Sequence, residues 1–290
     1  MKKLVKGILS LAVVAGLGLG AAVAQEPAGG EEHATTGTPH FPIHKPEQQD
    51  WTFAGLFGHY DKGQLQRGLK VYTEVCSACH SMNLVAFRTL EDLGYSEAQV
   101  KAFAANYEVQ DGPNADGEMF TRKAVPSDHF PSPFPNKEAA AAANNGAAPP
   151  DFSLIAKARG IERGFPQFVF DMFWPYQEGG PDYIHALLTG YQEPPEGVEV
   201  DEGTHYNPYF ANAAALAMAP PIADDQVTYD DGTPQTVDQY ARDVSAFLMW
   251  AAEPHLEDRK RTGFMVMVFL LIFTGLIYLT KKSVYANKKH

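Results

Sequence analysis

TEVCSACHSMN, residues 73–83, contains the only two cysteines of the 290-residue chain, Cys76 and Cys79, and places His80 directly after them. In a C-x-x-C-H motif each thiol can add to a vinyl group of haem, and the histidine can bind the iron from the same side. A thioredoxin-like dithiol needs a βαβ setting, which the flanking sequence lacks, and a zinc site needs four ligands, for which no second cysteine pair exists. The motif therefore predicts one covalently bound haem c with His80 as an axial ligand.

A second axial ligand has to approach the iron from the opposite face of the haem. Met82 lies only two residues from His80, so the chain between them is too short to pass around a porphyrin. Met218 has the best setting, because Pro220 and Pro221 fix the backbone after it and cannot continue a helix. The chemistry alone leaves five other residues open, which are Met119, Met172, His129, His185 and His205.

Both ends of the chain have the composition of segments that meet a membrane. Residues 1–24 combine three lysines with an apolar run that closes on Ala-Val-Ala, so we expect a cleaved secretory signal and an exported protein. Residues 264–280 carry no charge and are apolar on every face, which favours a transmembrane helix over 262–281 rather than a buried core helix. Because both flanks of this run are basic, the signal sets the orientation. We expect a periplasmic domain over 25–260 and a cytoplasmic tail over 282–290.

The exported part of the chain is strongly acidic. The whole chain has a net charge of −12, of which residues 1–24 contribute +3 and residues 258–290 contribute +6, which leaves −21 for residues 25–257. The acidic stretches 111–118 and 224–231 are candidate sources of this field. An exported domain with such a charge repels nucleic acid and anionic lipid and attracts a basic partner, although acidity also serves solubility.

Helical periodicity dominates the pattern between the two ends. We expect helices over 61–75, 96–109, 136–145, 182–191 and 236–254, separated by Pro-rich loops. A polar segment rich in Pro and Gly, residues 25–50, precedes the first of them. Alternating strand patterns are scarce, so the sequence predicts a mainly α domain with long ordered loops.

Several longer motifs carry a resemblance to a known family. They include CSACHSMNLVAFR (76–88), DYIHALLTGYQEPPEG (182–197), NPYFANAAALAMAPPI (207–222) and AFLMWAAEPHLEDRKR (246–261). At these residues the sequence resembles cytochrome c1, the haem subunit of the cytochrome bc1 complex. The resemblance implies a mainly α, class I-like cytochrome c domain, enlarged by long Pro-rich loops and followed by one C-terminal transmembrane helix.

The resemblance also implies roles for six residues. The covalent attachment points are Cys76 and Cys79, the axial ligands of the iron are His80 and Met218, and the contacts to the haem propionates are Arg159 and Tyr183. Two departures from the family pattern stand out. Residues 161–178 look like an insertion relative to shorter relatives, so Met172 is expected to be peripheral. Some bacterial relatives also carry a second cysteine pair that braces the region before the distal methionine, and this chain has none.

Electron transfer, rather than bond-making chemistry, is the function that the resemblance implies. Such a protein accepts one electron from the Rieske iron–sulfur protein and passes it to a soluble, basic cytochrome c. It is not a catalyst alone but belongs to a dimeric membrane complex with cytochrome b, a quinol–cytochrome c oxidoreductase. Two alternatives are the haem subunit of another membrane-bound dehydrogenase or oxidase, and a haem-based sensor with an open axial position.

Overall fold

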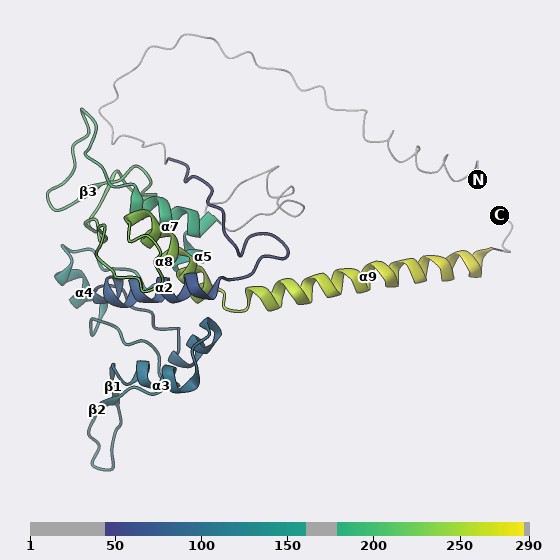
Figure 1. Ribbon diagram of the computed structural model, residues 1–290, viewed down its shortest axis with the longest axis horizontal. Coiled ribbons are helices and arrows are strands. Elements are labelled where there is room, and N and C mark those ends of the chain that lie inside the picture. Colours follow the sequence, from purple (N-terminus) through teal and green to yellow (C-terminus); the bar gives the residue numbers. More distant parts are fainter. Residues whose placement is uncertain (1–43, 161–178, 287–290) are drawn as a thin grey trace, which may run out of the picture. The chain divides into compact units, whose positions relative to one another are not determined.

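The computed structural model describes residues 44–160 and 179–286 of the chain. The expected signal peptide, residue Met172 with the expected insertion, and the last four residues of the expected tail lie outside this described part. Within it, helices predominate and the sheets are small (Figure 1). The prediction of a mainly α protein is confirmed.

Seven α-helices and two short 3-10 helices are found in the described residues. The α-helices are α2 (Lys62–Glu74), α3 (Glu97–Ala104), α4 (Lys137–Ala143), α5 (Ile155–Ala158), α7 (Gly179–Thr189), α8 (Val237–Ala252) and α9 (Leu256–Tyr285). The 3-10 helices are η1 (Cys76–Ala78) and η2 (Phe87–Leu93). Two antiparallel pairs of strands join β1 (Glu108–Asp111) to β2 (Phe120–Lys123) and β3 (His205–Tyr206) to β4 (Ala215–Leu216).

Four of the helices begin at a polar residue that caps the first turn. Each cap side chain accepts a hydrogen bond from the backbone N–H three residues further on, as an N-cap does. The capping residues are Asp61, Ser96, Asn136 and Thr236. The local chain chemistry therefore fixes where α2, α3, α4 and α8 start, close to the expected positions.

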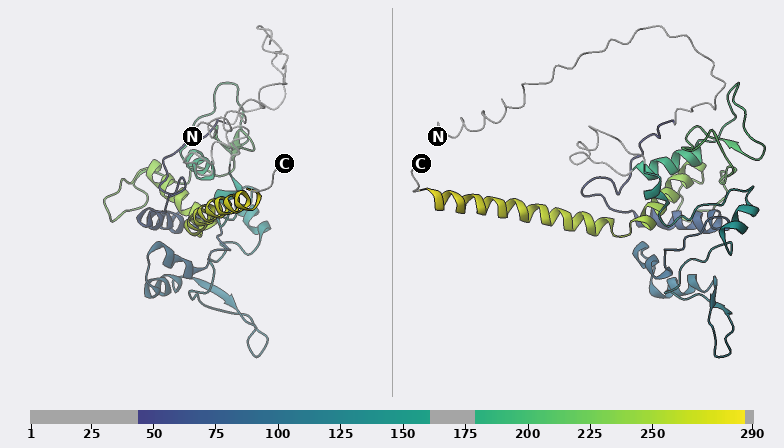
Figure 2. Two further views of the ribbon diagram at one scale, coloured as in Figure 1. Left: turned by 90° about the vertical axis from the view of Figure 1, so that its right-hand side faces the viewer. Right: turned by 180° about the vertical axis from the view of Figure 1, so that it is seen from behind.

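The helix expected over 96–109 is too long at its C-terminal end. α3 stops at Ala104, and residues 108–111 form β1 instead, beside which α3 lies in all three views (Figures 1 and 2). Exposed and partly buried residues alternate along β1, and Val109 packs against the core. Alternation with a period of two is typical of a strand with one face packed on the core, so residues 108–111 form a strand and not the end of a helix.

The core forms where α2 packs against α8. A Cβ atom at Gly68 would lie 2.2 Å from the carbonyl oxygen of Asp243 and 2.6 Å from the Cβ atom of Phe247, so only glycine permits this close approach. Beside it, the Arg67 guanidinium donates to the fully buried Asp243 carboxylate at 2.9 Å. Further along α2, the rings of Tyr72 and Phe247 lie 5.9 Å apart. The helix that leads into the C-x-x-C-H motif is thereby fixed on α8.

The C-terminal helix α9 runs without interruption for 30 residues (Figure 1). It contains the predicted span 262–281 and is long and apolar enough to cross a membrane, with none of its most apolar window buried within the described chain. It starts earlier than predicted because its first two turns are charged and helical before the apolar run begins. The length and composition of α9 are those of the transmembrane helix of a membrane-anchored protein.

Candidate haem-binding site

The C-x-x-C-H motif folds into a tight turn at the end of α2. The carbonyl oxygen of Cys76 accepts hydrogen bonds from the N–H groups of Cys79, at 3.1 Å, and His80, at 2.9 Å. The Tyr72 hydroxyl, one turn earlier in α2, donates to the His80 carbonyl oxygen at 3.2 Å. This turn keeps both thiols and the imidazole within one short, hydrogen-bonded unit.

Both cysteines are free thiols, Cys76 half-buried and Cys79 exposed. Burial, and secondly the neighbouring Cys79, raise the pKa of the Cys76 thiol to about 12. A dithiol oxidoreductase requires the opposite shift, since its attacking cysteine acts as a thiolate at neutral pH. Cys76 is therefore poorly suited to act as the attacking thiolate of a thiol–disulfide exchange, while two thiols at this spacing suit attachment to haem.

The imidazole of His80 is oriented by a main-chain group from a distant loop. Its Nδ1 lies 2.9 Å from the carbonyl oxygen of Pro150, which can only accept, so Nδ1 carries the proton and Nε2 is left for a metal. The ring of Phe152 stacks on the imidazole, with ring centroids 3.9 Å apart. Burial lowers the pKa of His80, against the opposing effects of the Pro150 bond and Asp151. The neutral imidazole that ligation requires is thus the favoured form.

The loop that contains Pro150 is itself tied to the chain after His80. The Phe152 N–H donates to the Ser81 carbonyl oxygen at 2.8 Å, and the Asp151 carboxylate accepts from the Ser81 hydroxyl, at 2.8 Å, and the Asn83 N–H, at 2.9 Å. Partial burial opposes ionisation of Asp151, but hydrogen bonds from Asn83, Ser153 and Ser81 lower its pKa below the ordinary value. A role for this loop could not be predicted from the sequence, because a backbone acceptor has no side-chain signature.

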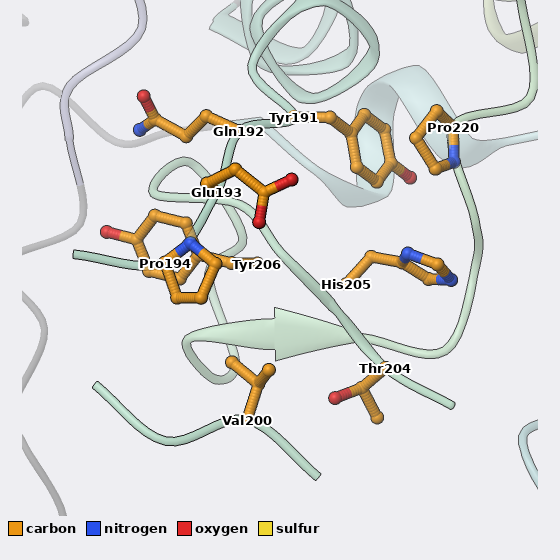
Figure 3. A pocket seen from close by; sticks show the side chains of 9 residues that line it. All are labelled: Tyr191, Gln192, Glu193, Pro194, Val200, Thr204, His205, Tyr206 and Pro220. Carbon is orange, nitrogen blue, oxygen red and sulfur yellow. The ribbon is translucent and has the colours of Figure 1, made fainter. Parts of the chain in front are cut away.

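Met218 follows strand β4 by two residues, and a tyrosine holds its backbone. The hydroxyl of Tyr191 donates to the Met218 carbonyl oxygen at 3.0 Å. Tyr191 and Pro220 also lie side by side on the rim of a pocket of about 520 Å³, with the tyrosine hydroxyl on the side of Pro220 (Figure 3). The chain around the expected distal ligand is therefore anchored to the segment that follows α7.

The chain after Met218 is fastened to the two core helices. The hydroxyl of Tyr240, a fully buried residue of α8, donates to the Val227 carbonyl oxygen and accepts from the Val227 N–H at 3.1 Å. Lys70 of α2 donates to the Thr228 carbonyl oxygen at 2.6 Å. These contacts, together with the Tyr191 bond, hold this segment in a chain that has no second cysteine pair.

The two expected propionate contacts lie on neighbouring helices. Arg159 is exposed at the C-terminal end of α5, and Tyr183 is buried in α7, where its hydroxyl accepts from the Ala211 N–H at 3.3 Å. α5 and α7 approach so closely that a Cβ atom at Gly180 would lie 1.6 Å from the Ala156 carbonyl oxygen. The structure brings these helices together, whereas contact of either side chain with a propionate stays a prediction.

The other candidates for the second ligand have different settings. Met119 is 60% exposed, His129 is exposed, and the His185 Nε2 atom lies 3.0 Å from an Asp238 carboxylate oxygen. His205 lines the pocket beside Tyr191 (Figure 3). Joint ligation of one iron by His80 and Met218 remains a prediction.

Comparison with known proteins identifies the family of this chain. The model of the Cytochrome C1 family matches residues 51–288. The protein named cytochrome c1 from Blastochloris viridis is 46% identical over 286 residues, which are 97% of this chain and 96% of that protein. Cytochrome c1 from Rhodospirillum rubrum is 46% identical over 264 residues, 86% of this chain and 89% of that protein. The cytochrome b/c1 of Bradyrhizobium diazoefficiens is 59% identical over 247 residues, 84% of this chain but 36% of that longer protein. The chain belongs to the cytochrome c1 family.

Proposed function

We propose that this protein is the membrane-anchored, mono-haem electron-transfer subunit of a cytochrome bc1 complex. It accepts one electron from the Rieske iron–sulfur protein and reduces a soluble cytochrome c. The observation that carries the proposal is the geometry at His80. The imidazole is buried and neutral and follows the two thiols directly; its Nδ1–H donates a hydrogen bond to the Pro150 carbonyl oxygen, which leaves Nε2 for iron.

The residues present fit one covalently bound haem c. Cys76 and Cys79 would form the thioether links, and His80 and Met218 would fill the two axial positions, which denies the iron to oxygen and other small ligands. When bound, the haem supplies one-electron transfer, and a thioether ligand favours the reduced iron and raises the potential. Arg159 and Tyr183 would contact the propionates from the adjacent helices α5 and α7.

The chain's own contacts keep the two ligand loops in place. Phe152 and Pro150 fix the imidazole, while Tyr191 holds the main chain at Met218. Rigid ligand loops suit an electron-transfer site, because little of the chain has to reorder when the charge on the iron changes.

The sequence pattern and the family support a location and partners for this subunit. A signal peptide over 1–24 and an anchor in α9 would place the haem domain on the periplasmic side of the cytoplasmic membrane. A relative whose name joins cytochrome b and c1 supports cytochrome b as a partner. The Rieske protein and a second copy of the whole assembly would complete a dimeric complex, and the acidic domain would favour a basic cytochrome c as acceptor.

Spectra and haem staining of the full-length protein test this proposal. We expect Cys76→Ser together with Cys79→Ser to abolish covalent haem on denaturing gels. Met218→Leu should keep the covalent haem but bind carbon monoxide and show a lowered potential, whereas the matched control Met119→Leu should leave the spectrum unchanged. Undiminished covalent haem in the double cysteine variant would refute haem c at this motif. Wild-type protein that binds carbon monoxide would favour a sensor, and purification without cytochrome b would favour another membrane-bound enzyme.

A further inference from the structure

A loop before α2 displays two large apolar side chains to solvent. In this loop, Ala54–Gly58, Leu56 is 54% exposed and Phe57 is 76% exposed. Phe53, directly before the loop, is 2% exposed, and Tyr60, two residues after it, is 8% exposed. The loop is therefore a projection from the core that carries apolar side chains outwards, which is unusual unless another surface covers them.

The loop is an ordered structure and not a loose connection. Its base is closed by a hydrogen bond from the His59 N–H to the Thr52 carbonyl oxygen at 3.0 Å. Gly55 has a φ of +71°, a conformation that favours glycine, and a Cβ atom at Gly58 would lie 2.0 Å from the Ala54 carbonyl oxygen. The backbone of the loop that carries the exposed Leu56 and Phe57 side chains is thus fixed by close contacts.

The same loop is tied to the first turns of α9. The Tyr60 N–H donates to the Glu257 carboxylate at 2.8 Å, and the Tyr60 hydroxyl donates to the Glu253 carbonyl oxygen at 3.2 Å. The Lys260 ammonium group donates to the Phe53 carbonyl oxygen. Bonds at both ends of the loop therefore fix its position relative to the start of α9.

Phe57 also contacts α9 at the point where the helix becomes apolar. Its ring packs edge-on against the ring of Phe264, with centroids 5.5 Å apart. Phe264 is the first residue of the apolar run 264–280, and it follows the basic residues 259–261 by less than one helical turn. The tip of the loop thus lies level with the boundary between the charged and the apolar part of α9.

From these contacts we infer that the Ala54–Gly58 loop is a second membrane contact, which inserts Leu56 and Phe57 into the lipid interface beside α9. The inference rests on the proposal that α9 spans the membrane. Apolar side chains in such a position lie about 5–10 Å deep, at the boundary between headgroups and acyl chains. The continuity of Phe57 with the lipid-facing surface of α9 favours lipid, rather than another subunit, as the occupant. Two points of attachment, one in the loop and one in the helix, would restrict the tilt of the haem domain over the membrane.

Photolabelling of the full-length, haem-loaded protein in its native membranes tests this inference. The probes are two phosphatidylcholines that carry a diazirine either near the headgroup or near the end of an acyl chain, and the labelled peptides are identified by mass spectrometry. We expect the shallow probe to label the peptide that contains Ala54–Gly58, the deep probe to label the middle of α9, and neither probe to label the peptide that contains Val125, which is also an exposed apolar residue, at 41%.

A double variant supplies the second arm of the experiment. Leu56→Ser with Phe57→Ser should lose the shallow label in the loop peptide and keep the label in α9. If the wild-type loop stays unlabelled while α9 is labelled, the loop inference is wrong and another subunit covers the loop or water surrounds it. If α9 itself is unlabelled by either probe, the membrane anchor fails, and with it the basis of the inference.

Discussion

The hydroxyl of Tyr191 donates a hydrogen bond of 3.0 Å to the main-chain carbonyl oxygen of Met218. Because the acceptor is a backbone atom, the bond positions the methionine without involving its thioether. The tyrosine belongs to the segment that follows α7, and its hydroxyl is desolvated by burial, which raises its pKa. It therefore stays a neutral donor across the physiological pH range.

We expect Tyr191→Phe to loosen the chain at Met218 while the haem remains attached. One such hydrogen bond contributes about 1 kcal/mol, so the potential should fall by at most about 40 mV if the whole effect acts on the reduced state. Potentiometric titration measures the shift, and carbon monoxide binding reports whether the distal ligand dissociates more easily. Tyr95→Phe, a half-buried tyrosine in the segment before α3, is the control. Equal potentials in the two variants would contradict a positioning role for Tyr191.

A second prediction concerns the crossing of α2 and α8. In Gly68→Ala the new methyl group would lie 2.2 Å from the Asp243 carbonyl oxygen, and neither helix can yield without disturbing the core. We expect a loss of about 3 kcal/mol in the free energy of unfolding. At Gly63, on the same helix, the nearest atom is an Asp61 carboxylate oxygen at 3.2 Å, so a shift of a few tenths of an ångström accommodates a methyl group. Gly63→Ala should change the stability by about 1 kcal/mol or less. Denaturant titration of the haem-loaded protein in detergent compares the free energies of unfolding of the two variants. Similar losses in both would show that the close approach of α2 and α8 at Gly68 does not limit the stability.

The sequence predicted those features that depend on local chain chemistry. The helices expected from residues 61 and 236 begin there because caps at Asp61 and Thr236 bind N–H groups three residues further on, and the apolar run of α9 is continuous. The predicted C-terminal end of the helix over 96–109 was wrong because residues up to 109 also fit a helical pattern. Only the packing of Val109 against the core favours a strand there.

The hydrogen bonds that hold the two ligand loops in place could not be predicted from the sequence. Pro150 lies 70 residues from His80, and Tyr191 lies 27 residues from Met218. In both pairs the acceptor is a backbone carbonyl, which every residue has, so the sequence carries no mark of it. Only the packing of α5 and α7 against α8 brings such groups together.

A third prediction concerns the junction of α5, α8 and α9. The carboxylate of Glu253 accepts from Lys157 at 2.7 Å and from Arg259. Its partial burial opposes ionisation, but the bonds from Arg259 and Lys157 lower the pKa of Glu253 below its ordinary value. A carboxylate with a lowered pKa stabilises the fold above the pKa of the unfolded state, and this contribution is lost as the pH falls through the folded-state pKa.

We therefore expect Glu253→Gln to destabilise the protein by about 0.5–1 kcal/mol at pH 7, a modest value because both cations are partly exposed. The difference from wild type should shrink towards zero as the pH is lowered below about 4. Denaturation midpoints measured at pH 7, 4 and 3 follow this change, because the contribution is lost only below the ordinary carboxyl pKa. Glu91→Gln, at an exposed position in η2, is the control and should show no such pH-dependent difference. A constant deficit at all three pH values would assign the effect of Glu253→Gln to packing rather than to charge.

The last prediction concerns how the acceptor finds the haem domain. Several carboxylates of the acidic stretches are already paired within the fold: Asp231 accepts from Arg67 at 2.8 Å, and Asp111 accepts from Arg122. Asp116 and Glu118, in contrast, are exposed at the end of the hairpin that joins β1 to β2. They are the better source of a field that reaches beyond contact.

We expect the reduction of a basic cytochrome c by the haem-loaded protein to slow steeply as the ionic strength rises. Long-range attraction between opposite charges can raise association rates by about 10- to 1000-fold, and the Debye length shortens to about 8 Å at physiological salt. Asp116→Asn with Glu118→Gln should flatten this dependence, while an acidic cytochrome c should show no acceleration at low salt. Stopped-flow rates across a salt series measure all three. A flat profile with the basic acceptor and wild-type protein would show that the acidity of residues 25–257 serves solubility or another partner, because a steered encounter cannot be indifferent to screening.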